Sequence, residues 1–160
     1  MVDASLPGFP EPALVRLVVI EDLKQLKARY FRFMDTKDWT SLRGVFTDDA
    51  TMDIDGFVTQ GGDAIVAFMS GVLANVKTVH HGHMPEITVV ENDHATGIWP
   101  MYDYVQFPGE DPDAAAQGLK GYGHYHDDYR KQHGTWRIAR THLVRLRVDP
   151  LPGGLPGQPT

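Results

Sequence analysis

The stretch Thr78-Val79-His80-His81-Gly82-His83-Met84-Pro85-Glu86-Ile87 places three imidazoles within four positions at the start of a predicted strand. Neighbouring side chains of a strand point to opposite faces, so His80 and Met84 are expected on one face and His81 on the other. Pro85 predicts a bulge or a sheet edge, because proline lacks the N–H that a central strand needs. Imidazole exchanges a proton near neutral pH. The stretch therefore indicates a functional site on a strand.

The composition points to a single globular domain. The 160 residues are 42% hydrophobic and 22% charged, and a chain of this length buries roughly 70% of the surface that it exposes when unfolded. The formal charge of −6, without a basic face outside the last strand, argues against a nucleic-acid partner. The absence of cysteine excludes a disulfide framework, a thiolate nucleophile and a cysteine-based zinc site.

Neither secretion nor membrane binding is predicted. Residues 1–8 lack a basic segment followed by an apolar one. The apolar stretch over residues 13–20 is interrupted by Arg16 and is too short to span a bilayer. We therefore expect a cytoplasmic protein without a membrane partner.

Helices are predicted in the first half of the chain. Residues 1–12 form an irregular lead-in whose last prolines suit a helix start. Apolar residues recurring at a spacing of 3.6 predict a helix over residues 13–37 and another over 64–75. A short helix is expected between them, over residues 39–46.

Two side chains of the first helix have alternative interpretations. Asp35 places a carboxylate at the negative end of the helix dipole, which is unfavourable by itself. Asp35 or Asp38 could cap the short helix, or Asp35 could point into a pocket and orient a histidine. Tyr30 lies within the buried arc, either as a core aromatic or as a phenol that donates a hydrogen bond into a cavity.

The rest of the chain is predicted to be mainly strands. Asp55-Gly56 indicates a hairpin between two short strands. Longer strands are expected over residues 76–90, 95–107, 118–132 and 135–148, with a loop over 108–117 and a Pro/Gly-rich tail over 150–160. Helices followed by strands predict the α+β class. One domain over residues 13–149 would pack its helices on one face of a curved antiparallel sheet and enclose a cavity.

Polar residues interrupt the apolar rows of the long strands. Asp103 shares a face with Trp99 and other apolar residues, and burying a carboxylate without a partner is costly. Either this face lies exposed in an oligomer groove or, as we expect, Asp103 has an arginine or histidine partner. The candidate arginines in the last strand are Arg140, Arg145 and Arg147. Tyr122 and His124 share a face of their strand, opposite glycines that leave room for a close approach.

Motifs spread over the chain carry a resemblance to a known family. They are Ile20-Glu21-Asp22-Leu23-Lys24, Tyr30-Phe31, Met34-Asp35-Thr36-Lys37-Asp38-Trp39, Phe46-Thr47-Asp48-Asp49-Ala50, the histidine stretch, Ala95-Thr96-Gly97-Ile98-Trp99 and Gly121-Tyr122-Gly123-His124-Tyr125. Residues 15–148 resemble the SnoaL-like branch of the nuclear-transport-factor-two-like superfamily, and within it the bile-acid dehydratase and scytalone dehydratase group. The resemblance implies a cone-shaped α+β barrel, with helices packed on a curved mixed or antiparallel sheet around a pocket.

The resemblance also implies a site without a cofactor. Its catalytic residues would be Tyr30, Asp35, His80, Asp103 and Arg145, with His80 as the base. Ile54 stands near the position where bile-acid dehydratases carry a second tyrosine, which puts the same substrate in doubt. The residues expected to contact the substrate are His83, His124, Tyr122, Trp99, Met84, Met101, Phe33 and Ile54.

This set of side chains suits the elimination of water next to a carbonyl group. The reaction needs a base for the acidic C–H, donors for the developing enolate oxygen and an acid for the leaving hydroxyl. His80, held in one tautomer by Asp35, could take the proton and return it to the hydroxyl, while Tyr30 hydrogen-bonds an oxygen. We expect a cofactor-independent lyase of the dehydratase type, acting on a small hydrophobic, ring-containing hydroxy compound.

Other functions are compatible with the same residues. Isomerases, dehydrohalogenases and carbon–carbon lyases of lignin-type aromatics also begin by removing a proton, and the fold also serves as a non-catalytic binding module. A metal enzyme using His80, His81 and His83 or His124 is disfavoured, because adjacent strand residues point to opposite faces. No metal is therefore expected. Apolar residues on both faces of the sheet, together with the resemblance, predict a homodimer or homotrimer.

Overall fold

The computed structural model describes residues 11–109 and 113–157. Its helices are α1 (Glu11–Asp35), α2 (Trp39–Arg43) and α3 (Gly62–Leu73), and they lie close to the predicted ranges. Most of the expected lead-in, residues 1–10, and the end of the expected tail, residues 158–160, lie outside the described residues.

The apolar spacing of α1 explains why it packs against the sheet. Leu23, Tyr30 and Met34 fall on one side of the helix and are at most 2% exposed. Each such side chain stabilises the fold by about 1.5–3 kcal/mol when it is buried. Glu21 and Gln25 lie on the exposed side, where the Gln25 amide donates a hydrogen bond of 2.8 Å to the Glu21 carboxylate. The predicted buried arc is therefore confirmed.

The strands form one mixed sheet. They are β1 (Phe46–Ile54), β2 (Phe57–Gln60), β3 (Lys77–Gly82), β4 (Glu86–Glu91), β5 (His94–Gln106), β6 (Gly118–Gln132) and β7 (Thr135–Pro150). Their order is β2-β1-β7-β6-β5-β3, and β4 also pairs with β5. Strands β1 and β7 run parallel, while the other pairs are antiparallel.

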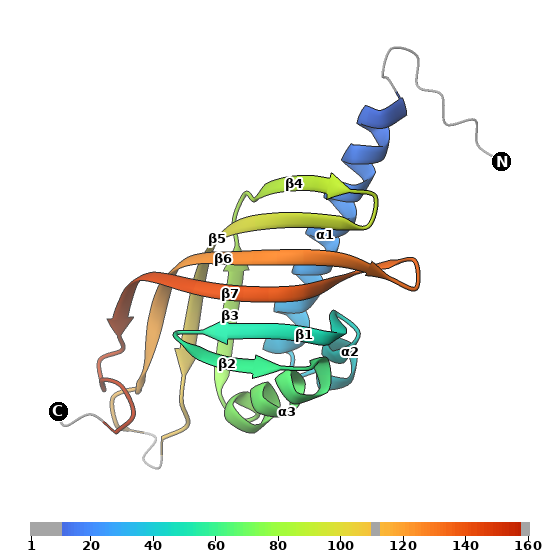
Figure 1. The fold of residues 1–160 in the computed structure, drawn as a ribbon. Helices are drawn as coiled ribbons and strands as arrows, with labels where there is room; N and C mark the ends of the chain where they lie inside the picture. The colour runs from blue at the N-terminus through green and yellow to red at the C-terminus, as the bar shows by residue number, and fades with distance from the viewer. Residues whose placement is uncertain (1–10, 110–112, 158–160) are drawn as a thin grey trace.

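The sheet is strongly curved but open, as Figure 1 shows. Strand β2 lies at one edge, strands β3 and β4 lie at the other, and no pairing among the described strands joins the two edges. The expected cone is therefore a curved sheet rather than a closed barrel. The α+β class, with helices packed on a curved mixed sheet, is confirmed.

The predicted strand over residues 76–90 is two strands. Strand β3 pairs with the second half of β5 and strand β4 with its first half, so both continue along the same neighbour. The interruption falls at residues 83–85, where the backbone N–H of His83 still donates to the carbonyl of Pro100 at 2.8 Å. Pro85 has no N–H to continue the ladder. The irregularity predicted at this proline is confirmed.

The first hairpin forms at the predicted turn. Asp55 and Gly56 have φ angles of 53° and 84°, as a two-residue turn with positive φ at both positions requires. The carboxylate of Asp53 also accepts the Gly56 N–H at 3.1 Å. Strand β1 starts at Phe46, so the short helix ends earlier than predicted.

The helices cover one face of the sheet and leave much of the other face open. Figure 1 shows α1 crossing behind β5, β6 and β7. Burial alternates along β5, and the covered row includes Trp99, Met101 and Asp103. Tyr125 and Tyr129 continue this row on β6. The core and the candidate site therefore lie on the same face, which we call the inner face.

Candidate active site

Helix α1 and strand β3 bring a carboxylate and an imidazole together at the inner face. Asp35 is the last residue of α1, and His80 lies in the middle of β3. The distance from His80 Nδ1 to Asp35 Oδ1 is 2.7 Å, and the backbone N–H of His80 donates to Oδ2 at 2.8 Å. Their side chains are 6% and 23% exposed. A ring and a backbone contact together fix Asp35 against His80.

The electrostatics of this pair define which nitrogen can act as a base. Burial by itself would raise the pKa of Asp35, but hydrogen bonds from His80 and Thr78 and the charge of His80 lower it below its usual range. An ionised carboxylate only accepts hydrogen bonds, so the proton of neutral His80 lies on Nδ1. Nε2 then carries the lone pair, and no described side chain is hydrogen-bonded to it. In this arrangement Nε2 is the nitrogen of neutral His80 that can accept a proton.

Aromatic rings surround the dyad. Phe31 lies nearly parallel to the His80 ring, with 6.2 Å between the ring centres, and Tyr30 lies edge-on to Phe31. Tyr30 is fully buried, and its hydroxyl interacts with the hydroxyl of Tyr125. Burial, and then the charge of Asp127, raises the pKa of Tyr30. The phenol therefore stays protonated.

The expected partner of Asp103 is Arg145. The guanidinium donates from Nη1 to Oδ1 at 2.9 Å and from Nη2 to Oδ2 at 2.7 Å. Burial would lower the pKa of Arg145, but the hydrogen bonds and charge of Asp103 raise it overall. Asp103 lies opposite His80 in the pairing of β3 with β5. The ion pair and the dyad are therefore neighbours on the inner face.

Gly121 makes room for this ion pair. A Cβ at this position would overlap both the Arg145 guanidinium and the Asp103 carboxylate. Arg145 pairs with Gly123 in the same inward row as Leu143, and its guanidinium extends past Gly121 to Asp103 on β5. The close approach that the glycines of β6 predicted is confirmed.

A pocket beside the dyad has a volume of about 360 Å³. It lies between α1 and the strands β3 and β5, and its lining combines charged and apolar residues. Its lining residues are Lys24, Ala28, Phe31, Arg32, Asp35, His80, His81, Gly82 and Trp99. A small ring-containing molecule fits a cavity of this size and character.

The other candidate substrate residues occupy different places. Trp99 lines the pocket, and its indole N–H donates to Tyr129 at 2.7 Å. Met101 is in the core, and Phe33 packs at its margin beneath the guanidinium of Arg32. Ile54, at the end of β1, is also partly buried against the core.

Of the eight candidates, only Trp99 lines the pocket, and the remaining four lie at the surface or on the outer face. Met84 is 89% exposed and His83 is also exposed, because the chain leaves the sheet after Gly82. Tyr122 and His124 lie on the opposite, outer face of β6, where Tyr122 is 36% exposed. The predicted alternation of β6 was correct, but the assignment of this row to the pocket was wrong, since Gly121 and its row face α1.

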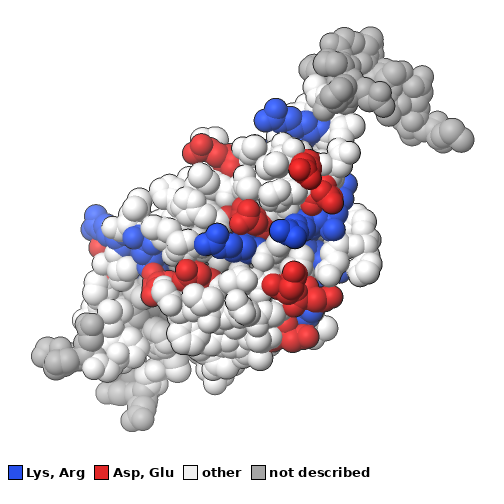
Figure 2. Space-filling view, in the orientation of Figure 1, with Lys and Arg blue, Asp and Glu red and all other residues white. Residues whose placement is uncertain are grey.

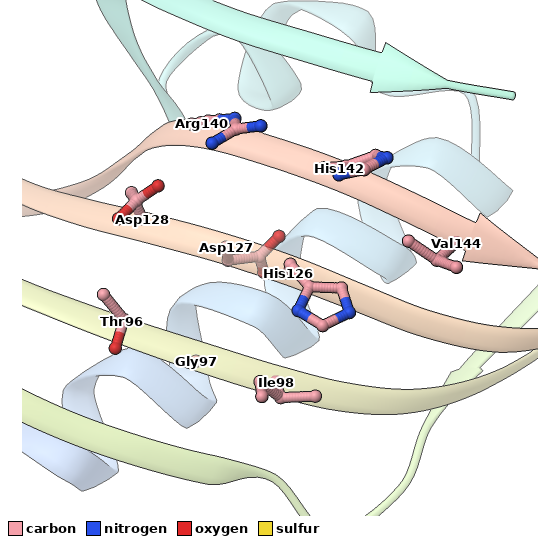
Figure 3. A pocket seen from close by; sticks show the side chains of 9 residues that line it. All are labelled: Thr96, Gly97, Ile98, His126, Asp127, Asp128, Arg140, His142 and Val144. Carbon is pink, nitrogen blue, oxygen red and sulfur yellow. The ribbon is translucent and has the colours of Figure 1, made fainter. Parts of the chain in front are cut away.

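A second depression, of about 520 Å³, lies on the outer face. Figure 3 shows side chains of β5, β6 and β7 around it, with the helix behind the sheet. The rings of His126 and His142 are 6.2 Å apart, and His142 Nε2 lies 3.7 Å from Asp53. The sheet separates this depression from the dyad.

Sequence reasoning missed a buried ion pair below the dyad. Lys27 Nζ lies 2.7 Å from Asp127 Oδ2, and both side chains are fully buried. The ammonium lies over the rings of Tyr30 and Tyr125, at 4.5 and 3.9 Å from their centres. Two signals were present in the sequence: Lys27 occupies the buried arc of α1, and Asp127 belongs to the inward row of β6, as Asp103 does in β5.

Comparison with known proteins identifies the family. The sequence profile of the SnoaL-like domain matches residues 15–142. The chain belongs to the SnoaL-like family. This SnoaL-like chain is 24% identical over 136 residues to the protein named Probable cyclase FGR4 of Gibberella zeae. The match covers 78% of this chain and 89% of the fungal one.

Solved structures share the SnoaL-like fold. A hexachlorocyclohexane dehydrochlorinase, LinA type 2, has a TM-score of 0.75 at 19% identity, covering 92% of this chain and 98% of that one. A Novosphingobium aromaticivorans protein assigned as a scytalone dehydratase has a TM-score of 0.75 at 19% identity, covering 92% and 99%. Relatives of this SnoaL-like chain thus include proteins named as enzymes.

Among the helices that the structure describes, none has both the length and the hydropathy of a membrane-spanning segment.

Proposed function

We propose that this SnoaL-like protein is a cofactor-independent lyase of the dehydratase type. The observation that carries the proposal is the His80–Asp35 dyad, in which a half-buried carboxylate at 2.7 Å orients the imidazole. A positioned imidazole of this kind contributes about 10²–10⁴-fold to a proton transfer. The pocket beside the dyad is partly apolar, which favours a small hydrophobic, ring-containing hydroxy compound as the substrate.

The first step of the proposed reaction is the removal of an acidic proton. Nε2 of His80 takes the proton from a carbon next to a carbonyl group, and the electrons of that C–H bond move toward the carbonyl oxygen. Asp35 stabilises the imidazolium that forms, because its carboxylate stays hydrogen-bonded to Nδ1. Tyr30 would donate to the developing oxygen charge only if the substrate reached it, because its fully buried side chain does not line the pocket.

The second step expels the hydroxyl group. The enolate electrons form the carbon–carbon double bond as the C–O bond breaks. The proton now held on Nε2 transfers to the departing oxygen, which leaves as water and returns His80 to its neutral form. The Arg145–Asp103 pair serves as structural support beside His80. Its two charges neutralise each other, so neither residue is assigned a step in the reaction.

Other reactions could start from the same base. An isomerase would return the proton to another carbon, and a dehydrohalogenase would expel a halide, which needs no proton. A carbon–carbon lyase would break a different bond after the same abstraction. A binding module would hold the compound without turnover. These alternatives differ in product, so one assay can separate them.

The deciding experiment is incubation in deuterated water with a panel of hydrophobic β-hydroxy ketones, hydroxysteroids, aryl diols and haloalkanes. Mass spectrometry then reports both product formation and deuterium uptake at the acidic carbon. We expect loss of water from at least one hydroxy compound. His80→Ala and Asp35→Asn should reduce turnover by about 10²-fold or more while the fold is kept.

A matched control is His94→Ala, since His94 lies at the end of β5 remote from Asp103. This variant should keep wild-type turnover. If neither product nor deuterium uptake appears while a compound binds tightly, the protein is a binding module. Turnover that survives His80→Ala would rule out this residue as the base.

We also propose that a second copy of this chain binds the outer face of the sheet. Tyr122, Val144 and Leu146 leave exposed apolar surface there, with Leu146 70% exposed. Asp128 and Arg140 lie opposite each other in the strand pairing, so two copies related by a two-fold axis could exchange these charges. Figure 2 shows both signs of charge interspersed over this face.

A further inference from the structure

The C-terminal end of α1 has an unusual residue at its turning point. The N–H of Lys37 donates to the carbonyl of Met34 at 3.3 Å, and the N–H of Asp38 donates to that of Phe33 at 2.8 Å. This pair of bonds is the Schellman motif, whose left-handed position is usually glycine. Lys37 occupies it with a φ angle of 61°. A lysine there costs conformational energy that a glycine would avoid, so the side chain needs another reason for its place.

The side chain of Lys37 reaches the dyad through Thr78. Its ammonium donates to Thr78 Oγ1 at 2.8 Å, and the Thr78 hydroxyl donates to Asp35 Oδ1 at 2.9 Å. Thr78 is 7% exposed, and it precedes His80 by one full period of β3, so both residues face α1. Lysine, threonine, aspartate and histidine therefore form one continuous hydrogen-bonded chain.

The order of donors gives this chain a single direction. A charged ammonium only donates, so it occupies a lone pair of Thr78 and leaves the hydroxyl hydrogen for Asp35. Asp35 only accepts, so it takes one hydrogen from Thr78 and one from His80 Nδ1. We propose that Lys37 and Thr78 are positioning residues that hold Asp35 in place and thereby keep the His80 proton on Nδ1. The inference rests on the proposed role of His80 as the base.

The positive charge of Lys37 also offsets the unfavourable position of Asp35 at the negative end of the helix dipole. A carboxylate in the last turn of a helix faces the negative end of the helix dipole. The charge of the Lys37 ammonium opposes that effect. Burial lowers the pKa of Lys37, and the charge of Asp35 counteracts part of that lowering. A cation beyond the last turn is favourable for the same reason. Glycine at position 37 would relieve the left-handed backbone, but it would remove the ammonium that donates to Thr78.

The test uses Thr78→Val, which keeps the shape and strand propensity of threonine and removes its hydroxyl. Proton–nitrogen correlation spectra of the ¹⁵N-labelled protein report the tautomer of His80 without any substrate. We expect a single Nδ1–H form in the wild type and a mixture of both tautomers in Thr78→Val. Thr78→Ser restores the hydroxyl and should restore the wild-type spectrum.

A second variant separates positioning from stability. Lys37→Gly relieves the left-handed backbone, so its Tm should equal or exceed that of the wild type, while its His80 spectrum should show the mixture. Lys77→Met removes an exposed lysine at the start of β3 and should change neither the Tm nor the His80 spectrum. Once a substrate is identified, kcat should fall about 10-fold in Thr78→Val and Lys37→Gly, with KM little changed.

The outcomes distinguish this inference from the proposed function. A wild-type tautomer in both Thr78→Val and Lys37→Gly overturns the inference, whatever the turnover. A mixed tautomer in a protein that turns over none of the panel compounds supports the positioning role and removes the lyase proposal. A Tm loss in Lys37→Gly with an unchanged spectrum would show that Lys37 serves the fold alone.

Discussion

The properties of individual side chains account for most of the chemistry of the site. Asp35 is an acceptor, Lys37 is a donor and His80 can be both, so their order along one hydrogen-bonded chain defines the free nitrogen. The Asp103–Arg145 pair has a different role, because each partner satisfies the charge of the other. Its geometry depends on Gly121, the residue that leaves space for the guanidinium.

Gly121→Ala should separate Arg145 from Asp103, because the added methyl group occupies the space of both side chains. We expect a loss of about 1–3 kcal/mol in the free energy of unfolding, the usual cost of overpacking. Gly71→Ala is the matched control, since Gly71 lies in α3 with open space around its Cα. It should gain up to about 1 kcal/mol from helix propensity. Urea denaturation of both variants measures the difference, and an equal effect in both would contradict this account.

Elements are joined by buried polar contacts as well as by apolar packing. Lys27 of α1 and Asp127 of β6 connect the long helix to the middle of the sheet. Asp127 also accepts hydrogen bonds from Tyr129 at 2.8 Å and Thr141 at 2.7 Å, so it links β6 to β7. Burial lowers the pKa of Lys27, and the nearby Asp127 opposes that shift. The pair therefore ties the helix that carries Asp35 to the sheet that carries His80.

Lys27→Met should be strongly destabilising, because it leaves the carboxylate of Asp127 buried without its cation. We expect a loss of about 3–5 kcal/mol, as for other broken buried ion pairs. The double variant Lys27→Met/Asp127→Asn removes the uncompensated charge and should recover part of that loss. Urea unfolding of the two variants tests this coupling. If the double variant is less stable than Lys27→Met, the orphaned charge is not the source of the cost.

The whole molecule presents two faces with different roles. The inner face holds the core, the dyad and the pocket, while the outer face carries Tyr122, Val144 and Leu146 beside mixed charges. Exposed apolar surface rimmed by polar residues is typical of a protein–protein interface. The proposed second copy would cover it without closing the pocket, since the sheet lies between them.

Leu146→Asp should weaken self-association, because it places a charge in the centre of the proposed apolar contact. We expect the variant to have the mass of a single chain under conditions in which the wild type is a dimer or larger. Val18→Asp, at a 61% exposed position of α1, is the matched control and should keep the wild-type mass. Size-exclusion chromatography with light scattering makes the comparison. A wild type that is itself a single chain would contradict the proposal.

Local patterns in the sequence were enough to predict the order of the elements and several of the contacts near the dyad. Its spacing of apolar residues located the helices, Asp55-Gly56 located the hairpin, and Pro85 located the break in the β3–β4 segment. An unpaired carboxylate in an apolar row predicted a partner for Asp103. The resemblance then placed Asp35 beside His80, which the structure shows at 2.7 Å. Apart from the resemblance, these are local patterns, because each depends on residues close together along the chain.

The face of each strand that the helices cover could not be predicted from local patterns and is set by packing. Alternation shows that Tyr122 and His124 share a face, but it does not show whether that face meets α1, because both rows have the same period. The same limit hid Lys27, whose burial depends on Asp127 lying across from it. It also hid the path from Lys37 through Thr78 to Asp35. Such contacts join residues far apart in the chain, and only packing brings them together.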